Sequence, residues 1–223
     1  METDNKPYPT GAGEEWDEQK ELLVVKEPPS VYGLANPVHY TYADYLSWMD
    51  NTRRELYNGV AHNLFSAPTR LHAEISSSLH LLIGWFIKKR QGKCKIFHAP
   101  FDVRLPKNEE TADNKIFTVV QPDICVVCDP KKLDGKGCIG APDLIVEVQS
   151  PSTGKRDLND KYHLYAEAGV REYWVVFPKE GITVFLLQET GKYDEGSVYE
   201  LGEKVQSSIF KGLEIDLRKL FEE

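Results

Sequence analysis

The chain contains 223 residues, which is enough for one large domain or two small ones. Hydrophobic residues make up 41% of it and charged residues 28%, a composition that supports a buried core and excludes a collagen-like or wholly disordered protein. The formal net charge of −8 argues against a protein that coats nucleic acid by bulk electrostatic attraction.

Residues 1–35 are expected to form an acidic, flexible tail, followed by a folded domain over residues 36–223. The first 30 residues alone carry eight acidic and three basic side chains, and prolines and glycines interrupt any periodic pattern. This stretch lacks the apolar region of a secretion signal, and no apolar run in the chain reaches the roughly 20 residues of a membrane span. The sequence therefore predicts a cytoplasmic protein without a membrane partner.

The domain is expected to begin with a short helix and a hairpin. Thr41 and Asp44 have the spacing of a capping box, which predicts a helix over residues 42–51. Residues 55–65 predict two short strands joined by a turn at Asn58–Gly59, because Asn-Gly favours the tight turns of hairpins.

A long helix is expected over residues 69–90. Its predicted apolar stripe consists of Ile75, Leu79, Leu82 and Phe86. A basic cluster follows at its end, formed by Lys88, Lys89, Arg90, Lys93 and Lys95. This cluster is either a phosphate-binding patch or a solvated helix end, and the second interpretation is favoured because lysine seldom occupies buried sites.

The rest of the domain alternates between strands and helices. The pattern predicts strands at 95–105, 117–128, 142–149, 172–177, 181–188 and 193–201, and helices at 155–169 and 213–223. Gly169 is a suitable residue to end the first of these helices. This order indicates an α/β or α+β domain with a mixed central β-sheet flanked by helices.

Two acidic residues lie inside apolar strands. Because side chains alternate along a strand, Glu147 shares one face with Gln149, and antiparallel pairing centred on Gly135 would place Asp123 beside Glu147. The long connection allows other registers. Two carboxylates on one apolar face would repel each other, and a bound Mg²⁺ or Mn²⁺ would relieve that repulsion. The alternative is that one or both acids face solvent or cap a loop.

Lys161 lies four residues after Asp157 and four before Tyr165, so the three share one helix face. Leu158 is on that face too, which indicates that it packs inward and carries the ammonium group towards the sheet. The alternative is an exposed helix with an ordinary Asp–Lys pair, and spacing alone favours that alternative.

The four cysteines give only a weak metal signal. Cys125 and Cys128 have the spacing of a zinc motif with Cys138 nearby, but a strand would turn the first two towards opposite faces, and Cys94 is distant. We therefore expect buried, reduced thiols and neither a zinc site nor a disulfide scaffold.

Five segments together resemble a known family. They are RRELYNG, the helix that begins near His72, QPDICVV, APDLIVEVQSPST and DLNDKYHLYAEAGVREYWVVFP. In order and spacing they resemble the Uma-two family of restriction-endonuclease-like proteins, which has the PD-(D/E)XK nuclease fold. The resemblance extends over residues 38–222 and leaves the N-terminal tail outside. It implies a restriction-endonuclease-like core.

The resemblance also implies a set of site residues. Asp123 matches the aspartate of the PD motif and Glu147 the acid of the (D/E)XK motif, and both would bind Mg²⁺ or Mn²⁺. His72 and Glu55 match positions that complete the metal shell in related nucleases, although spacing alone would make His72 a packed or capping histidine and Glu55 a solvated edge residue.

One family position differs in this chain. The third residue of the motif, usually lysine, is Gln149 here. Gln149 could position a water molecule but could not accept its proton. The resemblance implies that Lys161, on the next helix, supplies the missing ammonium group and makes it a catalytic residue together with Asp123, Glu147 and Gln149.

The function implied is a metal-dependent DNA endonuclease that acts as a homodimer, because cutting two strands needs two sites. No organic cofactor is expected. An alternative is a non-catalytic module of the same fold that binds nucleic acid or protein, which Gln149 and the net acidity favour. A third possibility is a metal hydrolase of a small phosphate ester.

Overall fold

The computed structural model describes residues 39–50, 52–64, 68–108, 110–149 and 154–222, with only the backbone described over 154–158. The tail expected at residues 1–35 lies outside the described residues. The helices are α1 (Tyr42–Ser47), α2 (Arg70–Lys89), α3 (Gly154–Ala168) and α4 (Leu217–Phe221), with 3-10 turns at Asp113–Lys115 and Pro130–Lys132.

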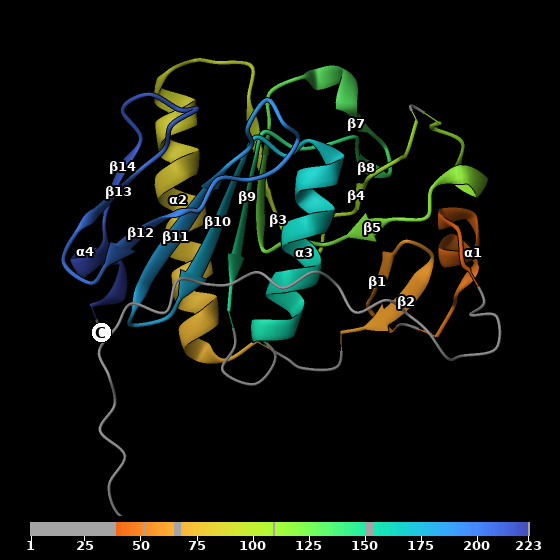
Figure 1. Ribbon diagram of the computed structural model, residues 1–223, viewed down its shortest axis with the longest axis horizontal. Helices are drawn as coiled ribbons and strands as arrows, with labels where there is room; N and C mark the ends of the chain where they lie inside the picture. The colour runs from red at the N-terminus through yellow and green to blue at the C-terminus, as the bar shows by residue number, and fades with distance from the viewer. Residues whose placement is uncertain (1–38, 51, 65–67, 109, 150–153, 223) are drawn as a thin grey trace, which may run out of the picture.

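A six-stranded mixed sheet agrees with the expected architecture (Figure 1). Its strands in spatial order are β12 (Ser197–Glu200), β11 (Gly181–Leu186), β10 (Glu172–Phe177), β9 (Leu144–Val148), β6 (Ile124–Val127) and β3 (Lys95–His98). β9 and β10 are parallel, and the other neighbouring pairs of this sheet are antiparallel. Helix α3 joins the parallel pair, because parallel neighbours need a crossover connection.

Helices α2 and α3 cover opposite faces of this sheet (Figure 1). The alternation of side chains produces two cores: along β9, Val146 packs in the core on the α2 side and Ile145 packs in the core on the α3 side. Strands buried on both faces have continuous apolar sequences, and for that reason the bounds of β10 coincide with those predicted.

A second six-stranded sheet was not expected. Its strands in order are β2 (Val60–Asn63), β1 (Arg54–Tyr57), β5 (Val119–Val120), β4 (Val103–Arg104), β8 (Gly137–Ile139) and β7 (Leu133–Asp134). The segments 95–105 and 117–128, each predicted as one strand, are divided between the two sheets. Pro100 and Pro122 lie at the divisions, because proline cannot donate a hydrogen bond to a strand ladder.

The local signals near the start of the domain are largely confirmed. The Thr41 hydroxyl accepts a hydrogen bond from the Asp44 N–H, and the Asp44 carboxylate accepts one from the Thr41 N–H, completing the capping box. Asn58 and Gly59 both have positive φ, as a tight hairpin turn requires. Helix α1 is shorter than predicted, because Trp48 becomes extended and packs against the ring of Tyr45.

The predicted stripe of α2 is wrong in its second half. The buried residues of this helix are Ile75, Leu79, Ile83 and Ile87. Leu82 is 42% exposed, and Phe86 is only partly buried. Steps of three and of four residues both suit an amphipathic helix, and the chain has apolar residues at both. The side chains that pack against the sheet are the ones spaced four residues apart, from Ile75 to Ile87.

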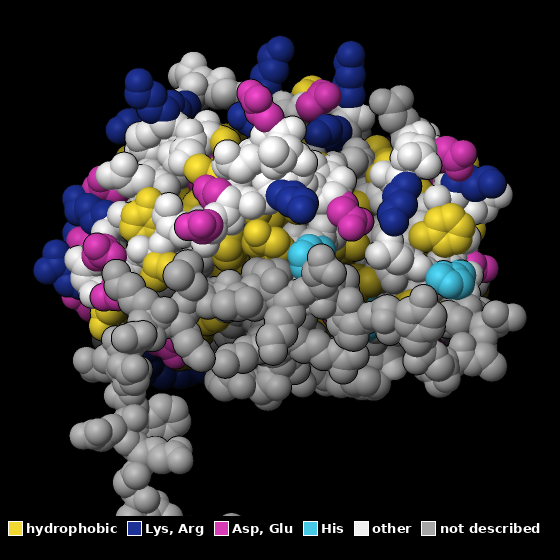
Figure 2. Space-filling view, in the orientation of Figure 1, with side chains coloured by type: hydrophobic (Ala, Val, Ile, Leu, Met, Phe, Trp, Pro, Cys, Tyr) yellow, Lys and Arg dark blue, Asp and Glu magenta, His cyan; other side chains and the backbone are white. Residues whose placement is uncertain are grey.

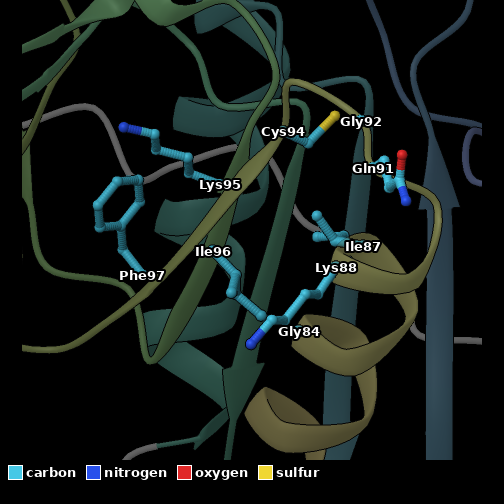
Figure 3. Close-up of a pocket in the computed structure, with 9 residues that line it drawn as sticks. All are labelled: Gly84, Ile87, Lys88, Gln91, Gly92, Cys94, Lys95, Ile96 and Phe97. Atoms are coloured by element: carbon cyan, nitrogen blue, oxygen red, sulfur yellow. The ribbon is translucent and has the colours of Figure 1, made fainter.

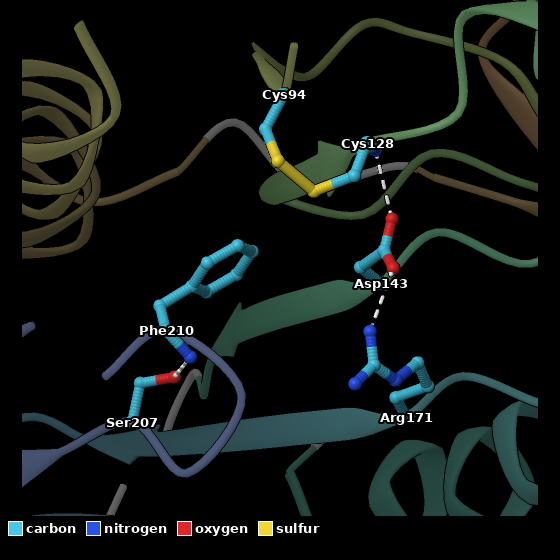
Figure 4. The surroundings of a disulfide bond; sticks show 6 residues. All are labelled: Cys94, Cys128, Asp143, Arg171, Ser207 and Phe210. Atoms are coloured by element: carbon cyan, nitrogen blue, oxygen red, sulfur yellow. Dashed lines mark hydrogen bonds and ion pairs between the residues drawn. A yellow bond between two sulfur atoms is a disulfide. The ribbon is translucent and has the colours of Figure 1, made fainter. Parts of the chain in front are cut away.

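Two cysteines form a disulfide, contrary to the prediction of reduced thiols. Cys94 bonds to Cys128 (Figure 4). The register of β3 and β6 pairs Lys95 with Val127, so the next residues along, Cys94 and Cys128, lie opposite each other. The two cysteines are 34 residues apart, so the short cysteine spacings used to recognise motifs in a sequence did not predict this pairing. Cys125 and Cys138 are buried free thiols, as expected.

The C-terminal region adds a small layer on the α2 side. A two-stranded sheet of β13 (Lys204–Gln206) and β14 (Glu214–Asp216), which was not predicted, precedes α4. The helix predicted over 213–223 is therefore wrong at its start, where residues 214–216 pair with β13 as a strand, and α4 begins only at Leu217. Leu217 and Leu220 of α4 join the core beneath α2. Across the part of the chain that the structure describes, none of the helices has the length and apolar character needed to cross a membrane.

Candidate active site

The pairing of β6 with β9 has the register that the sequence predicted. Ile124 lies opposite Val146 and Cys125 lies opposite Ile145. One step beyond this ladder, Asp123 and Glu147 come together on the face that α3 covers. Two acids that are 24 residues apart in the sequence are therefore neighbours on adjacent strands.

Asp123 connects the sheet to the beginning of α2. Its Oδ2 accepts a hydrogen bond from the Val148 N–H at 2.8 Å and lies 3.1 Å from Nε2 of His72. The N-cap residue Thr69 fixes this end of the helix by accepting a hydrogen bond from the His72 N–H. The hydrogen bond with Asp123 raises the pKa of His72, although burial opposes the change.

Glu147 is the buried centre of the cluster, with 6% of the residue exposed. Its Oε1 accepts hydrogen bonds from Nζ of Lys161 at 2.8 Å and from the Tyr165 hydroxyl at 2.7 Å. Both donors come from the face of α3 that the sequence predicted to turn inward. The alternative of a solvent-exposed Lys161 is excluded, because the residue is buried.

Glu55 reaches the same cluster from β1 of the second sheet and is 1% exposed. Its Oε1 accepts a hydrogen bond from the Gln121 N–H at 2.7 Å and lies 3.6 Å from Nζ of Lys161. Its Oε2 accepts a hydrogen bond from the Tyr57 hydroxyl at 2.6 Å. The two sheets thus meet at Lys161, which has a carboxylate from each.

The electrostatics of the cluster are those of several acids around one cation. Burial raises the pKa of Glu147 to about 7, and the charges of Asp123 and Glu55 add to the shift while Lys161 opposes it. Burial alone would lower the pKa of Lys161, but Glu147 and Glu55 outweigh it and raise that pKa well above its ordinary value. Lys161 therefore stays protonated, and the acids compete for its charge.

Gln149 lies just after β9, on the Glu147 face by strand alternation. Its N–H donates to the Val176 carbonyl at 2.8 Å, which extends the pairing of β9 with β10. The ammonium group near Glu147 comes from Lys161, which approaches from the helix.

The donor chemistry of the cluster fits a hard divalent cation. Asp123 and Glu147 offer carboxylate oxygens, and Mg²⁺ is commonly held by one or two carboxylates together with water and substrate phosphate. Among the described residues, no group of three or more His, Cys, Asp or Glu side chains is arranged to hold a metal. The metal roles of His72 and Glu55 stay predictions.

Three members of the network were missed as site residues: Tyr165, Tyr57 and Gln121. Tyr165 had a signal, since it lies one helical turn after Lys161. The Gln121 side chain accepts hydrogen bonds from Arg53 and donates to Asp102. Its backbone N–H binds Glu55, so this residue anchors the segment that leads into Asp123.

Two other features lie away from this cluster. The basic cluster begins 16 residues after His72 on α2, which corresponds to about 24 Å along the helix. Figure 2 shows Lys and Arg side chains along the upper edge of the molecule, the edge at which α2 ends in Figure 1. A cavity of about 460 Å³ lies there between α2 and β3 (Figure 3). Its lining residues are Gly84, Ile87, Lys88, Gln91, Gly92, Cys94, Lys95, Ile96 and Phe97.

A mixed sheet between two helices, with acids on neighbouring strands and a buried lysine beside them, defines a restriction-endonuclease-like protein. The family model of Uma2, described as "Putative restriction endonuclease", matches residues 42–218. The chain belongs to this family.

Two individual proteins are similar to the chain. Uncharacterized protein slr1290 of Synechocystis sp. is 26% identical over 155 residues, which cover 69% of this chain and 74% of that protein. A crystal structure described as a putative nuclease belonging to DUF820 from Anabaena variabilis matches with a TM-score of 0.64 at 20% identity. That match covers 82% of this chain and 97% of the other, and it supports the shared fold.

Proposed function

We propose that this protein is a nuclease that uses a divalent metal ion to hydrolyse phosphodiester bonds in DNA. The observation that carries the proposal is the contact between Nζ of Lys161 and Oε1 of Glu147, 2.8 Å long, beside Asp123. This contact offers the ammonium group that the (D/E)XK motif lacks when its third residue is Gln149. The family supports a nuclease, and the acids support the metal.

Asp123 and Glu147 are the residues that would hold Mg²⁺ or Mn²⁺. When bound, the ion would neutralise charge on the phosphate and lower the pKa of the attacking water. The Val148 N–H and His72 orient Asp123, and the Tyr165 hydroxyl orients Glu147. Fixed ligands reduce the reorganisation that binding requires.

Lys161 would stabilise the negative charge that develops on the phosphate in the transition state. Its position between two carboxylates keeps it protonated, so it suits the role of a cation better than that of a base. Gln149 would position water through its amide. Neither residue is suited to accept the proton of the attacking water.

The DNA substrate is proposed from family membership. The basic cluster at the end of α2 lies about 24 Å from His72, the length of about seven base pairs, so it would contact phosphates distant from the bond that is cut. Cleavage of both strands would require a second copy of the site, for which we propose a homodimer.

The test is cleavage of supercoiled plasmid DNA with Mg²⁺ or Mn²⁺. We expect Asp123→Asn to abolish cleavage while the fold, measured by circular dichroism, is retained. The matched control is Glu172→Gln, which alters a buried acid of β10 on the opposite face of the sheet from the cluster. Equal cleavage by the parent and Asp123→Asn would refute the proposal, as would cleavage that persists in excess chelator.

A second candidate is a non-catalytic binding module on the same fold. Two observations favour it: Gln149 replaces the usual lysine, and no three-ligand group is arranged among the described residues. Calorimetric titration with Mn²⁺ separates the candidates. Binding that Asp123→Asn removes supports the nuclease, and DNA binding without any metal binding supports the module.

A further inference from the structure

The Lys161–Glu147 pair is held from two directions. From the second sheet, Oε1 of Glu55 lies 3.6 Å from Nζ of Lys161. From α3, the Tyr165 hydroxyl donates to the same Glu147 oxygen that accepts from Lys161.

The carboxylate of Glu55 is already engaged by neighbouring groups, as expected of a residue that acts by positioning others. Both of its oxygens accept hydrogen bonds, one from the Gln121 N–H and one from the Tyr57 hydroxyl. Gln121 precedes Pro122 and Asp123 directly, so Glu55 connects the segment bearing Asp123 to Lys161. The residue is fixed by these contacts and is 1% exposed.

The Tyr165 contact determines which oxygen of Glu147 remains available. Oε1 accepts two hydrogen bonds, from Lys161 and Tyr165, whereas no described residue donates a hydrogen bond to Oε2. Two donors on Oε1 orient this carboxylate, and Oε2 is the oxygen that we assign to a cation.

The net charge of the cluster also indicates that Glu55 leaves Glu147 available to a cation. With Asp123, Glu147 and Glu55 ionised and His72 neutral, the cluster has three negative charges and the one positive charge of Lys161, and a divalent cation would neutralise the difference. Without Glu55, Lys161 would be neutralised by Glu147 alone, and that acid is then less available to a metal ion.

We propose that Glu55 and Tyr165 are positioning residues that hold the Lys161–Glu147 pair so that Glu147 can bind a cation while Lys161 stays beside it. This inference rests on the proposed function and replaces the ligand role that family resemblance implies for Glu55. Replacing a residue that hydrogen-bonds to a metal ligand or its partner typically alters metal affinity about 10- to 100-fold.

The experiment measures Mn²⁺ affinity by calorimetry and the plasmid-cleavage rate at saturating Mn²⁺. Tyr165→Phe and Glu55→Gln should each weaken Mn²⁺ binding by about 10- to 100-fold without abolishing it. Glu55→Asp, which keeps the charge, should recover part of the loss. Glu55→Gln should also slow cleavage at saturating Mn²⁺, because Lys161 loses the second of the two carboxylates that position its ammonium group.

The matched controls remove the same chemical groups elsewhere. Tyr193→Phe deletes a buried hydroxyl that binds the Val170 carbonyl in the same core as Tyr165, and Glu172→Gln deletes a buried charge. Both should bind Mn²⁺ as the parent does, and thermal unfolding of all the variants measures whether a loss of stability alone weakens binding.

Three results would overturn the positioning roles: parental Mn²⁺ binding in both site variants, loss in Glu55→Gln as complete as in Asp123→Asn without rescue by Glu55→Asp, or no Mn²⁺ binding by the parent. The last would also remove the proposed function. If the parent binds Mn²⁺ through Asp123 yet cleaves no DNA, the nuclease proposal alone fails, and the binding data still decide the roles of Glu55 and Tyr165.

Discussion

Two buried carboxylates on neighbouring strands of the central sheet are accommodated in different ways. Glu172 on β10 accepts hydrogen bonds from the Trp174 indole, the Ser207 hydroxyl and the N–H groups of Ser208 and Ile209, all of them neutral donors. Glu147 on β9 instead faces a lysine and two further acids. The sheet positions them on opposite faces, towards α2 and α3 respectively.

The difference separates a structural acid from a functional one. Glu172 joins the 207–209 loop to the sheet. Four neutral groups donate hydrogen bonds to its carboxylate, and none of these donors is a charged side chain. Glu147 sits where like charges gather, an arrangement that costs stability unless a cation offsets it. Clustered acids of this kind are typical of sites that bind or react, because a structure selected only for stability would avoid them.

The largest effect is expected from Lys161→Met, which leaves Glu147 and Glu55 without a cation. Removing one partner of a buried ion pair costs about 3–5 kcal/mol, and loss of a transition-state cation costs about 10²- to 10³-fold in rate. The stability loss should be larger at pH 8 than at pH 5, because Glu147, whose pKa is already raised to about 7, is protonated at the lower pH. Urea denaturation at both pH values measures this, and equal losses would contradict it.

Replacing each acid with its amide tests whether the charge is needed at both positions. Glu147→Gln should reduce metal-dependent cleavage by at least about 10²-fold, whereas Glu172→Gln should leave the rate per folded molecule unchanged. The two variants preserve side-chain shape, so the contrast isolates charge. Cleavage assays normalised to the folded fraction provide the measurement, and similar losses in both variants would show that the two acids do not differ in function.

The smallest effect is expected in the pH dependence of stability. Burial raises the pKa of Glu172, although its hydrogen bonds oppose the shift. The folded state therefore holds this proton more tightly than the unfolded chain, and Glu172 contributes stability that is lost as the pH rises from about 4.5 through the raised pKa. The difference in free energy of unfolding between parent and Glu172→Gln should shift against the parent over that range. A constant difference would contradict the assignment.

Much of the candidate site was predictable because its signals are local. The alternation of side chains along two apolar strands, with antiparallel pairing, predicted Asp123 beside Glu147, and the register confirms it. Helical spacing placed Lys161 and Tyr165 on one inward face. Spacing alone favoured an exposed Lys161 in an ordinary Asp–Lys pair, and this was wrong, because a four-residue repeat does not show which side of the helix packs against the sheet.

Other features required the complete chain. The second sheet brings Glu55 to Lys161 across more than one hundred residues, and the β3–β6 register brings Cys94 to Cys128. The sequence by itself determined the elements with short-range periods and turns, because backbone geometry imposes those periods on any chain. The tertiary structure alone decided which sheet each broken strand joins and which acids share the lysine, because those choices depend on packing free energy summed over contacts between distant segments.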